Sequence, residues 1–396
     1  MSEWKKVALG KVAEFVRGIN FKPNDVVPVG TLGSVVCMRT KNVQTELELS
    51  DVWAVDKSFV KRENQFLQVG DVLVSSANSW NLVGKCCWIP ELPWHASFGG
   101  FVTVLRPDKG KVEPRFLYRW FSSNRVQALL RSFGQQTTNI SNLNIDRCLK
   151  LEIPLPPPEE QRRIAEILDR AEELRSKRRE AIAQLDSLTQ AIFIEMFGDP
   201  VTNPKGWERK PIKKIGEVIT GNTPSRANPD YYGTAIEWIK SDNINTPYYY
   251  LTQAEEGLSE AGKAVARIVA AGAILVTCIA GSPACIGNAA IVNREVAFNQ
   301  QINALVPQQG NVHFLFAQIL TAKRLIQDAS TASMKGMVSK SRFEEIRLIF
   351  PPLNLQQEFA AHMEAVEKLK AAHRSSLSEL DALFASLQHR AFRGEL

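Results

Sequence analysis

Two stretches of the chain repeat apolar residues at alternating steps of three and four, the pattern of a coiled-coil helix. Pro-Pro pairs precede both stretches, and Gly198 followed by Asp199-Pro200 ends the first. The pattern predicts two helices over residues 159–197 and 354–392, each roughly 50–60 Å long. The first apolar seam consists of Ile164, Ile167, Ala171, Leu174, Ala181, Leu185, Leu188 and Ile192. The second consists of Phe359, Val366, Leu369, Leu377, Leu380, Leu383 and Leu387.

The two helical stretches are copies of each other. At a spacing of 195 residues the same amino acids recur, among them Pro156/Pro351, Gln161/Gln356, Glu172/Glu367 and Asp186/Asp381. The stretches before the helices repeat as well: MRTKNV (38–43) matches IKSDNI (239–244), and VGDVLVSS (69–76) matches AGAILVTC (271–278). Internal repetition at one spacing indicates a tandem duplication of one structural unit.

The repeats predict four segments. Two globular domains cover residues 1–152 and 201–350, and helical spacers cover 153–200 and 351–396. Short apolar runs such as VLVSS and FVTVLRP alternate with a helical pattern in each globular stretch, which predicts mixed α/β (α+β) domains. We expect a pseudo-twofold arrangement in which the two long helices form an antiparallel coiled coil.

The midpoints of the predicted helices carry polar residues on the apolar seam, Arg178 in the first and His373 in the second. In an antiparallel pair related by a twofold axis, these two residues meet and fix the register, as single polar seam residues can. The alternative is that both side chains extend to water along the helix surface.

Composition and charge exclude several classes. The chain has 396 residues, 44% of them hydrophobic and 23% charged, which is typical of a globular protein. The net charge is +6 for residues 1–152, −3 for 153–200, +4 for 201–350 and −1 for 351–396. Weakly basic domains permit nucleic-acid binding without proving it. No stretch is apolar enough to span a membrane, and six cysteines without paired spacing predict a reduced, cytoplasmic protein.

These features resemble the specificity subunit of type I restriction–modification systems. The resemblance covers the whole chain and rests on PLPPPEEQ and FPPLNLQQ before the helices, LDSL and LDAL within them, and GQQTTNIS before the first. It implies two target-recognition domains that each read half of a split double-stranded DNA sequence. It also implies partners: two methyltransferase subunits, which would carry S-adenosylmethionine, and restriction–translocation subunits. The second copy departs from the pattern at Leu355, where an acidic residue is common.

Polar loops follow the repeated strands and are the candidate DNA-reading segments, because amides pair with adenine edges and cations with guanine and phosphate. An ordinary solvated loop remains the alternative for each single residue. In the first domain the candidates are Arg39, Lys41, Asn42, Asn78, Trp80, Lys85, Gln135, Gln136, Thr138 and Asn139. In the second they are Arg226, Lys240, Asp242, Asn243, Tyr248, Ser282, Lys335, Ser339, Lys340 and Arg342.

Catalytic motifs are weak. NPDYY (228–232) resembles the Asn-Pro-Pro-Tyr of adenine methyltransferases, but Asp230 replaces the second proline and no Gly-rich cofactor loop precedes it. A turn is the expected structure there. The five histidines lack metal-ligand spacing, so we expect no cofactor, no metal and no catalysis by this chain. Two other hypotheses remain at this stage: an autonomous adenine methyltransferase, and a helical adaptor without a role on DNA.

Overall fold

The computed structural model describes residues 4–133, 135–136, 140–330 and 336–396. The chain forms two compact units. Unit 1 comprises residues 1–178 and 376–396, and unit 2 comprises residues 179–375. Both long helices run from one unit into the other, so each unit contains one part of each helix. The four segments drawn from the sequence remain a prediction about the chain's linear organisation.

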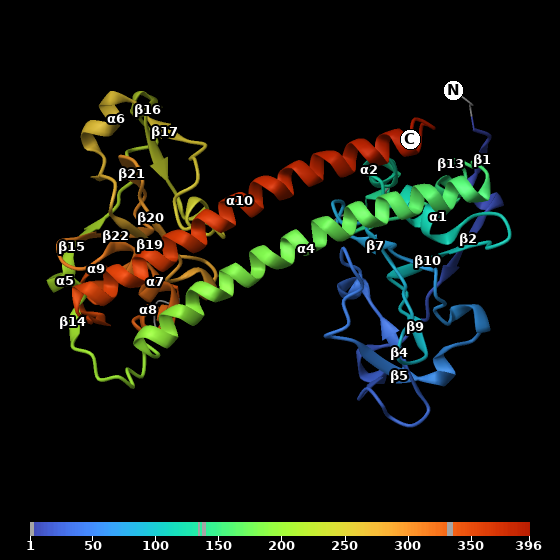
Figure 1. The fold of residues 1–396 in the computed structure, drawn as a ribbon, viewed down its shortest axis with the longest axis horizontal. Helices are drawn as coiled ribbons and strands as arrows, with labels where there is room; N and C mark the ends of the chain where they lie inside the picture. Colours follow the sequence, from blue (N-terminus) through green and yellow to red (C-terminus); the bar gives the residue numbers. More distant parts are fainter. Residues whose placement is uncertain (1–3, 134, 137–139, 331–335) are drawn as a thin grey trace. The chain divides into compact units, whose positions relative to one another are not determined.

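Unit 1 contains two four-stranded sheets and a two-stranded ribbon (Figure 1). The first sheet has the order β2 (Ala13–Arg17), β10 (Val102–Pro107), β6 (Val72–Ser75), β8 (Cys86–Trp88). The second has the order β3 (Val26–Val27), β5 (Trp53–Asp56), β4 (Ser34–Met38), β9 (Ala96–Phe98), with β4 and β9 parallel. The ribbon pairs β1 (Lys6–Ala8) with β13 (Glu152–Pro154). The helices are α1 (Pro114–Phe121), α2 (Asn124–Ser132) and α3 (Ile145–Leu149).

Unit 2 repeats the ribbon and the order of the first sheet, whereas its second sheet shares three strands with that of unit 1 and adds the fourth at the opposite edge. Its first sheet has the order β15 (Gly216–Thr220), β22 (Ile302–Pro307), β19 (Ile274–Thr277), β20 (Ala289–Ile291). Its second has the order β17 (Gly257–Leu258), β16 (Tyr232–Ile239), β21 (Val296–Phe298), β18 (Ile268–Val269), again with one parallel pair, β16 and β21. The ribbon pairs β14 (Arg209–Pro211) with β23 (Arg347–Ile349). The helices are α5 (Ile212–Ile215), α6 (Glu260–Val265), α7 (Val312–Thr321), α8 (Lys323–Asp328) and α9 (Lys340–Glu345). The predicted duplication of mixed α/β domains is confirmed.

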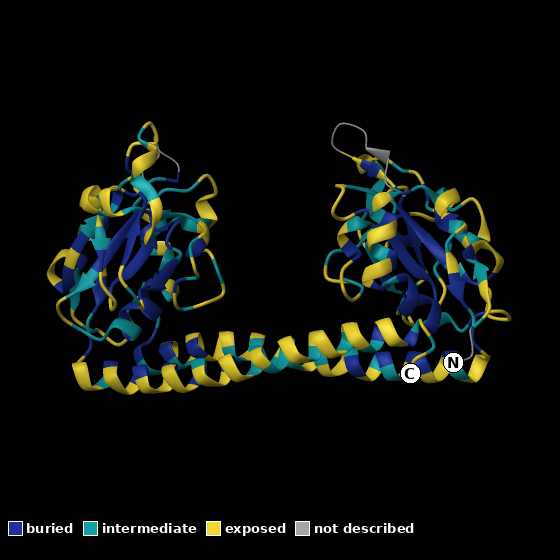
Figure 2. Ribbon diagram, turned by 90° about the horizontal axis from the view of Figure 1, so that it is seen from above, coloured by how far each residue is buried: buried dark blue, intermediate teal, exposed yellow. Residues whose placement is uncertain are grey.

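Each unit buries its strands in its interior and packs part of both long helices against its core (Figure 2). In unit 1, Ile164 and Leu168 of α4 (Pro158–Phe197) join a core with Phe116 and Phe121. In unit 2, the corresponding Phe359 and Met363 of α10 (Leu353–Ala391) join Phe314 and Ile319. Burial of such side chains contributes about 1.5–3 kcal/mol each. The globular core and its helices are therefore one cooperative body in each unit.

The Pro-Pro-x-x-x-Gln motif is a helix-start clamp. Gln161 is 2% exposed; its Nε2 donates to Pro156 O at 2.8 Å, and its Oε1 accepts from Glu113 N at 2.8 Å. Gln356 repeats both bonds, donating to Pro351 O at 2.8 Å and accepting from Asn311 N at 2.9 Å. A buried amide must be satisfied in this way, because leaving it unpaired costs about 1–3 kcal/mol. The glutamine thus ties each long helix to the helix that follows the main sheet, α1 or α7.

The two long helices are antiparallel within each unit. In unit 1, Arg175 of α4 bonds Asp381 of α10 at 2.6 Å. In unit 2, Lys370 of α10 bonds Asp186 of α4 at 2.7 Å, and the Phe193 and Phe359 rings lie 5.4 Å apart. Residues later in α4 therefore contact residues earlier in α10, as the sequence predicted. Arg178 belongs to unit 1 and His373 to unit 2, so their proposed meeting stays a prediction.

The predicted seam is wrong at four leucines. Leu174, Leu188, Leu369 and Leu383 are 56%, 42%, 52% and 50% exposed. The buried steps are Ile164, Leu168 and Ala171 in α4, followed by the half-buried Arg175, and Phe359, Met363, Val366 and Lys370 in α10. The pattern favoured the leucines because leucine is a typical residue of a coiled-coil seam. In the structure the next residue, Arg175 after Leu174 and Lys370 after Leu369, occupies the seam. A cation can be accommodated on the seam because carboxylates of both helices pair with it.

Candidate nucleic-acid interface

Three loops of unit 1 converge on one place. The Lys85 Nζ donates to Gln44 Oε1 at 2.5 Å, which joins the loop after β6 to the loop after β4. Strand β7 (Ala77–Asn78) pairs with β12 (Ser141–Asn142), which pairs with β11 (Gln135–Gln136). The sequence placed candidates in all three loops, and the structure brings these segments together from positions about a hundred residues apart.

The same three loops converge in unit 2. Asn288 Nδ2 donates to Asn245 Oδ1 at 2.7 Å, joining the loop after β19 to the loop after β16. Ala280 N donates to Gly336 O at 3.0 Å, and Ile279 forms a bridge with Met337. Both units therefore present one composite face built from equivalent loops, which we call the loop face.

Two of the predicted contacts hold the fold instead. Asn42 is fully buried: its Oδ1 accepts from Arg39 N at 2.8 Å, and its Nδ2 donates to Glu48 O and Asp51 O. Asn243 is 8% exposed; it accepts from Lys240 N at 3.0 Å and donates to Gln253 O at 3.1 Å. Their amides are occupied by the 3-10 turns η3 (Thr40–Asn42) and η7 (Ser241–Asn243). The match of MRTKNV to IKSDNI therefore reflects a shared turn.

A carboxylate lies between two candidate cations in each unit. Asp51 pairs with Arg39 at 3.0 Å and also with Lys41, and Arg39 lies 3.7 Å from the centre of the Trp53 ring. Glu256 pairs with Lys240 at 2.7 Å and with Arg226 at 2.8 Å. The hydrogen bond from Lys41 holds the pKa of Asp51 below its usual value, and the hydrogen bond from Lys240 does the same for Glu256. Both acids are thus ionised at neutral pH and partly neutralise the loop face.

The remaining candidates are mostly accessible. Trp80 is 54% exposed, and Tyr248 is 45% exposed with Arg374 at 4.8 Å from its ring. Asn78 donates to Ser75 Oγ at 3.1 Å, Ser339 caps α9, and Arg342 donates to Ala329 O. Asp242 and Ser282 are exposed, and Lys340 pairs weakly with Glu344 at 3.7 Å. Thr138, Asn139 and Lys335 lie outside the described residues, as do the side chains of Gln135 and Gln136.

The sequence reading missed Phe101. Its side chain is 67% exposed, and its carbonyl accepts from Ser76 N and Ala77 N, directly beside β7. An aromatic residue after Gly99-Gly100 reads in sequence as the start of the buried strand β10, so the alternation of apolar residues gave no signal. The loop face of unit 1 therefore carries two strongly exposed aromatic rings, Phe101 and Trp80.

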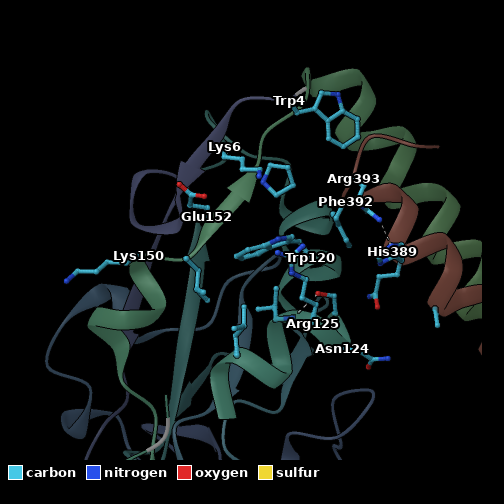
Figure 3. A pocket seen from close by; sticks show the side chains of 17 residues that line it. Trp4, Lys6, Trp120, Asn124, Arg125, Lys150, Glu152, His389, Phe392 and Arg393 are labelled. Atoms are coloured by element: carbon cyan, nitrogen blue, oxygen red, sulfur yellow. Dashed lines mark hydrogen bonds between the residues drawn. The ribbon is translucent and has the colours of Figure 1, made fainter. Parts of the chain in front are cut away.

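Unit 1 also contains a basic cavity of about 700 Å³ that shares no residue with the predicted contacts (Figure 3). Lys6, Arg125, Lys150 and Arg393 line it together with the rings of Trp4, Trp120 and Phe392. Glu152 is the one carboxylate among its lining residues. The positive charge of unit 1 is thus not confined to the loop face.

The stretch that resembles a methyltransferase motif forms a turn. NPDYY forms the predicted turn: Asn228 caps η6 (Pro229–Tyr231) by accepting from Asp230 N at 3.1 Å. Burial raises the pKa of Cys37, Cys87, Cys148 and Cys278 to about 12, so these thiols are poor nucleophiles at neutral pH. Within the described ranges no three metal-ligating side chains cluster, and no helix is long and apolar enough to cross a membrane.

Comparison with known proteins gives one consistent family. The sequence model of the type I restriction modification DNA specificity domain matches residues 1–184 and 204–381. The type I restriction enzyme HindI specificity subunit of Haemophilus influenzae is 21% identical, with 100% of both chains covered. The EcoKI specificity subunit of Escherichia coli is 23% identical over 99% of this chain and 89% of its own.

The fold agrees with that family. The crystal structure of the type I restriction–modification S subunit from M. genitalium superposes with a TM-score of 0.57 at 15% identity, covering 98% of this chain and 96% of its own. The match of the family model extends over most of both units. The chain therefore belongs to the type I restriction–modification DNA specificity family and is a specificity subunit of such a system.

Proposed function

We propose that each loop face reads one half of a bipartite double-stranded DNA target, and that this chain directs methyl transfer without performing it. The observation that carries the proposal is the convergence of the same three loops in both units of a chain of this family. Duplicated scaffolds with different loop residues supply two readers with different sequence preferences. Long helices that continue from one unit into the other supply a spacer between them.

The proposed reading residues are those that the structure leaves accessible. In unit 1 they are Lys41, Asn78, Trp80 and Lys85, and in unit 2 Arg226, Lys240, Asp242, Tyr248, Ser282, Ser339, Lys340 and Arg342. Gln135, Gln136, Thr138, Asn139 and Lys335 are proposed from the sequence alone. Amides and hydroxyls suit base edges, and the cations suit phosphates and guanine. Asn42 and Asn243 are left out because their amides are already bonded within the turns.

The exposed leucines supply the proposed docking places for two methyltransferase subunits. Leu174 precedes Arg175, which contacts Asp381 and Phe384, so Leu383 lies at the same level of the helix pair in unit 1. Leu369 precedes Lys370, which contacts Asp186, and this places Leu188 near the same level in unit 2. In each unit these leucines form one pair at a single level of the two helices, and two equivalent pairs suit two copies of one partner. Exposed apolar groups on a helix surface are typical of such contacts.

Catalysis is assigned to the partner. In this proposal S-adenosylmethionine binds the methyltransferase subunit, and a restriction–translocation subunit joins the same complex. The HindI and EcoKI relatives are named as specificity subunits of type I restriction enzymes, which supports a multi-subunit assembly. The loop faces contribute the choice of sequence.

Methyl transfer to duplex DNA tests the proposal. The chain is purified alone and together with the methyltransferase subunit of the same system, and transfer from labelled S-adenosylmethionine is measured. We expect transfer only with both proteins present, at one bipartite sequence. Transfer by the chain alone, or by the partner alone at the same sequence, contradicts the proposal.

The docking places are tested by charge insertion. Leu174→Lys with Leu383→Lys is expected to weaken assembly at unit 1 and reduce the number of bound methyltransferase subunits from two to one. The matched control is Leu32→Lys, because Leu32 is 100% exposed in unit 1 and lies outside both long helices. Unchanged stoichiometry in the double variant, measured by native mass spectrometry, contradicts this docking place.

A further inference from the structure

The turn from β9 to β10 in unit 1 and the turn from β21 to β22 in unit 2 make the same backbone hydrogen bonds. In unit 1 it covers residues 98–102, and in unit 2 residues 298–302. Ile19 N donates to Phe98 O at 2.8 Å and Gly99 N to Met38 O at 2.9 Å. The equivalents are Asn222 N to Phe298 O at 3.0 Å and Asn299 N to Ile239 O at 3.0 Å. The backbone path of the turn is therefore the same.

A close approach fixes the turn in both units. A Cβ atom at Gly18 would lie 2.3 Å from Gly99 O, and one at Gly221 would lie 2.2 Å from Asn299 O. Real Cβ atoms do not approach an oxygen so closely, so glycine is required at both positions. This explains why Gly18 and Gly221 recur in the sequence repeat, and it pins the turn against the second strand of each unit.

The last turn residue joins this common scaffold to the loop face through its backbone carbonyl. Phe101 O accepts from Ser76 N at 3.0 Å and from Ala77 N at 3.2 Å. Gln301 O accepts from Cys278 N at 2.8 Å and from Ile279 N at 3.0 Å. Phe101 and Gln301 thus occupy one structural position, beside the loop that follows β6 in unit 1 and β19 in unit 2.

The chemistry at this position differs between the units. Phe101 is 67% exposed, and the neighbouring loop adds Trp80 at 54% and Leu82 at 38%. Gln301 is half-buried, and its Oε1 accepts from Asn299 Nδ2 at 3.2 Å. A phenyl ring can make only apolar contacts with a base edge, and the thymine methyl group is the apolar feature of the major groove. A glutamine amide can instead pair with adenine.

From this geometry we infer that position 101, with its equivalent 301, is a specificity-determining position, and that Phe101 contacts the methyl group of a thymine in the first half-site. The inference rests on the proposed function, because it requires that the loop face of unit 1 lies against DNA. Phe101 has no role in the core that would explain a ring in this place, since two-thirds of it is exposed. The ring reads an apolar feature, and Gln301 gives the second half-site a different preference.

Removal of single methyl groups from the DNA tests this inference. The chain is assembled with its methyltransferase subunits, and binding to the cognate duplex is measured while each thymine of the first half-site is replaced in turn by deoxyuridine. One replacement is expected to weaken binding by the wild type roughly fourfold, the effect of one buried methyl group. The same replacement is expected to leave binding by Phe101→Ala unchanged, because the contact is already absent.

The controls separate the inference from the proposed function. Leu32→Ala, which alters an exposed side chain of unit 1 outside the loop face, is expected to keep the wild-type sensitivity to deoxyuridine. Gln301→Ala is expected to keep it as well, and to relax base preference in the second half-site only. If no deoxyuridine affects the wild type, or if Phe101→Ala responds as the wild type does, the inference is overturned. A wild-type complex that binds no bipartite duplex overturns the proposed function itself.

Discussion

The same ion cluster appears once in each unit, with a different cation and a different degree of burial. In unit 1, Arg175 bonds Glu172 and Asp381 and lies 4.4 Å from the centre of the Phe384 ring. In unit 2, Lys370 bonds Glu367 at 2.8 Å and Asp186 at 2.7 Å, and it donates to Tyr249 Oη at 3.0 Å. Arg175 keeps 17% of its side chain exposed, whereas Lys370 is fully buried.

The difference arises from the globular loops. Tyr249 belongs to the loop after η7, and its hydroxyl also donates to Thr189 of α4, so this loop covers Lys370. In unit 1 the loop after η3 reaches α4 through a longer hydrogen bond, from Ser176 Oγ to Glu46 Oε1 at 3.4 Å. The duplication therefore preserved the acidic residues of the cluster, while the cation and the loop that approaches it diverged. The two units therefore share the geometry of their helices and sheets and differ in the loops that contact them.

Substitution of Gly18 or Gly221 should have the largest effect on stability, and the effect should be equal in the two units. Gly18→Ala and Gly221→Ala each place a methyl group 2.2–2.3 Å from a backbone oxygen, which forces the turn to move. We expect a loss of about 3 kcal/mol in the free energy of unfolding for each variant, measured by urea denaturation. Gly281→Ala, which meets nothing within 4 Å, is the control and should change little. Tolerance of alanine at one of the two positions would break the equivalence of the turns.

Lys370→Met should give the next largest effect. It removes the cation of Asp186 and leaves Glu367 with the more distant Arg374, 3.8 Å away. We expect a loss of about 2–3 kcal/mol, below the range for fully buried pairs because Asp186 is 45% exposed. Lys368→Met is the matched control, since Lys368 is exposed and lies two residues earlier on α10. A denaturation midpoint no lower than that of the control would mean that the cluster does not hold unit 2 together.

The pH dependence of this cluster has a definite sign. Burial lowers the pKa of Lys370, but its bonds to Asp186, Glu367 and Tyr249 outweigh burial and raise the pKa above the usual value. The stabilisation is therefore complete below about pH 10, the unfolded pKa of lysine, and disappears as the pH rises through the folded pKa. The stability difference between the wild type and Lys370→Met should shrink in that alkaline range and stay constant between pH 6 and 9.

Arg175→Met should cost less than Lys370→Met. Arg175 keeps 17% of its side chain exposed whereas Lys370 is fully buried, so solvent screens the Arg175 pair more strongly. We expect a loss of about 1 kcal/mol. A loss equal to or larger than that of Lys370→Met would reverse the comparison between the two clusters.

The smallest effects should come from the acids of the loop faces. Asp51→Asn frees Arg39 and Lys41, and Glu256→Gln frees Lys240 and Arg226. Each change should tighten duplex binding by the assembled complex and increase the salt dependence by about one phosphate contact. Unchanged salt dependence in both variants would place these cations away from DNA.

The sequence was informative where the repeat has a local physical cause. The Pro-Pro start, the glycine stop and the three-four spacing predicted α4 and α10 to within a residue at each end. The repeat also predicted which loops are equivalent. Burial was harder to predict: Leu369 is exposed and Lys370 is buried, because the partners of the lysine come from another helix and a distant loop.

The structure brings the candidate loops together in each unit, and their contact with DNA stays a prediction. Asn42 and Asn243 recur in the sequence repeat, which predicted base contacts. An asparagine whose side chain caps a tight turn recurs in the same way, and this is the role of both residues in the structure. Phe101 was overlooked because its exposure depends on the backbone path beside β7, which no periodicity reveals. Long-range contacts decide which polar residues are free.

Mapping methylated bases in a cell in which this chain is the only specificity subunit tests the central claim most directly. The wild type should mark one motif made of two different short sequences with a constant gap. Replacing residues 78–85 of unit 1 with alanine at the exposed polar positions should alter one of these sequences and leave the other and the gap unchanged. A single uninterrupted motif, or a change in both sequences at once, would contradict the existence of two independent readers.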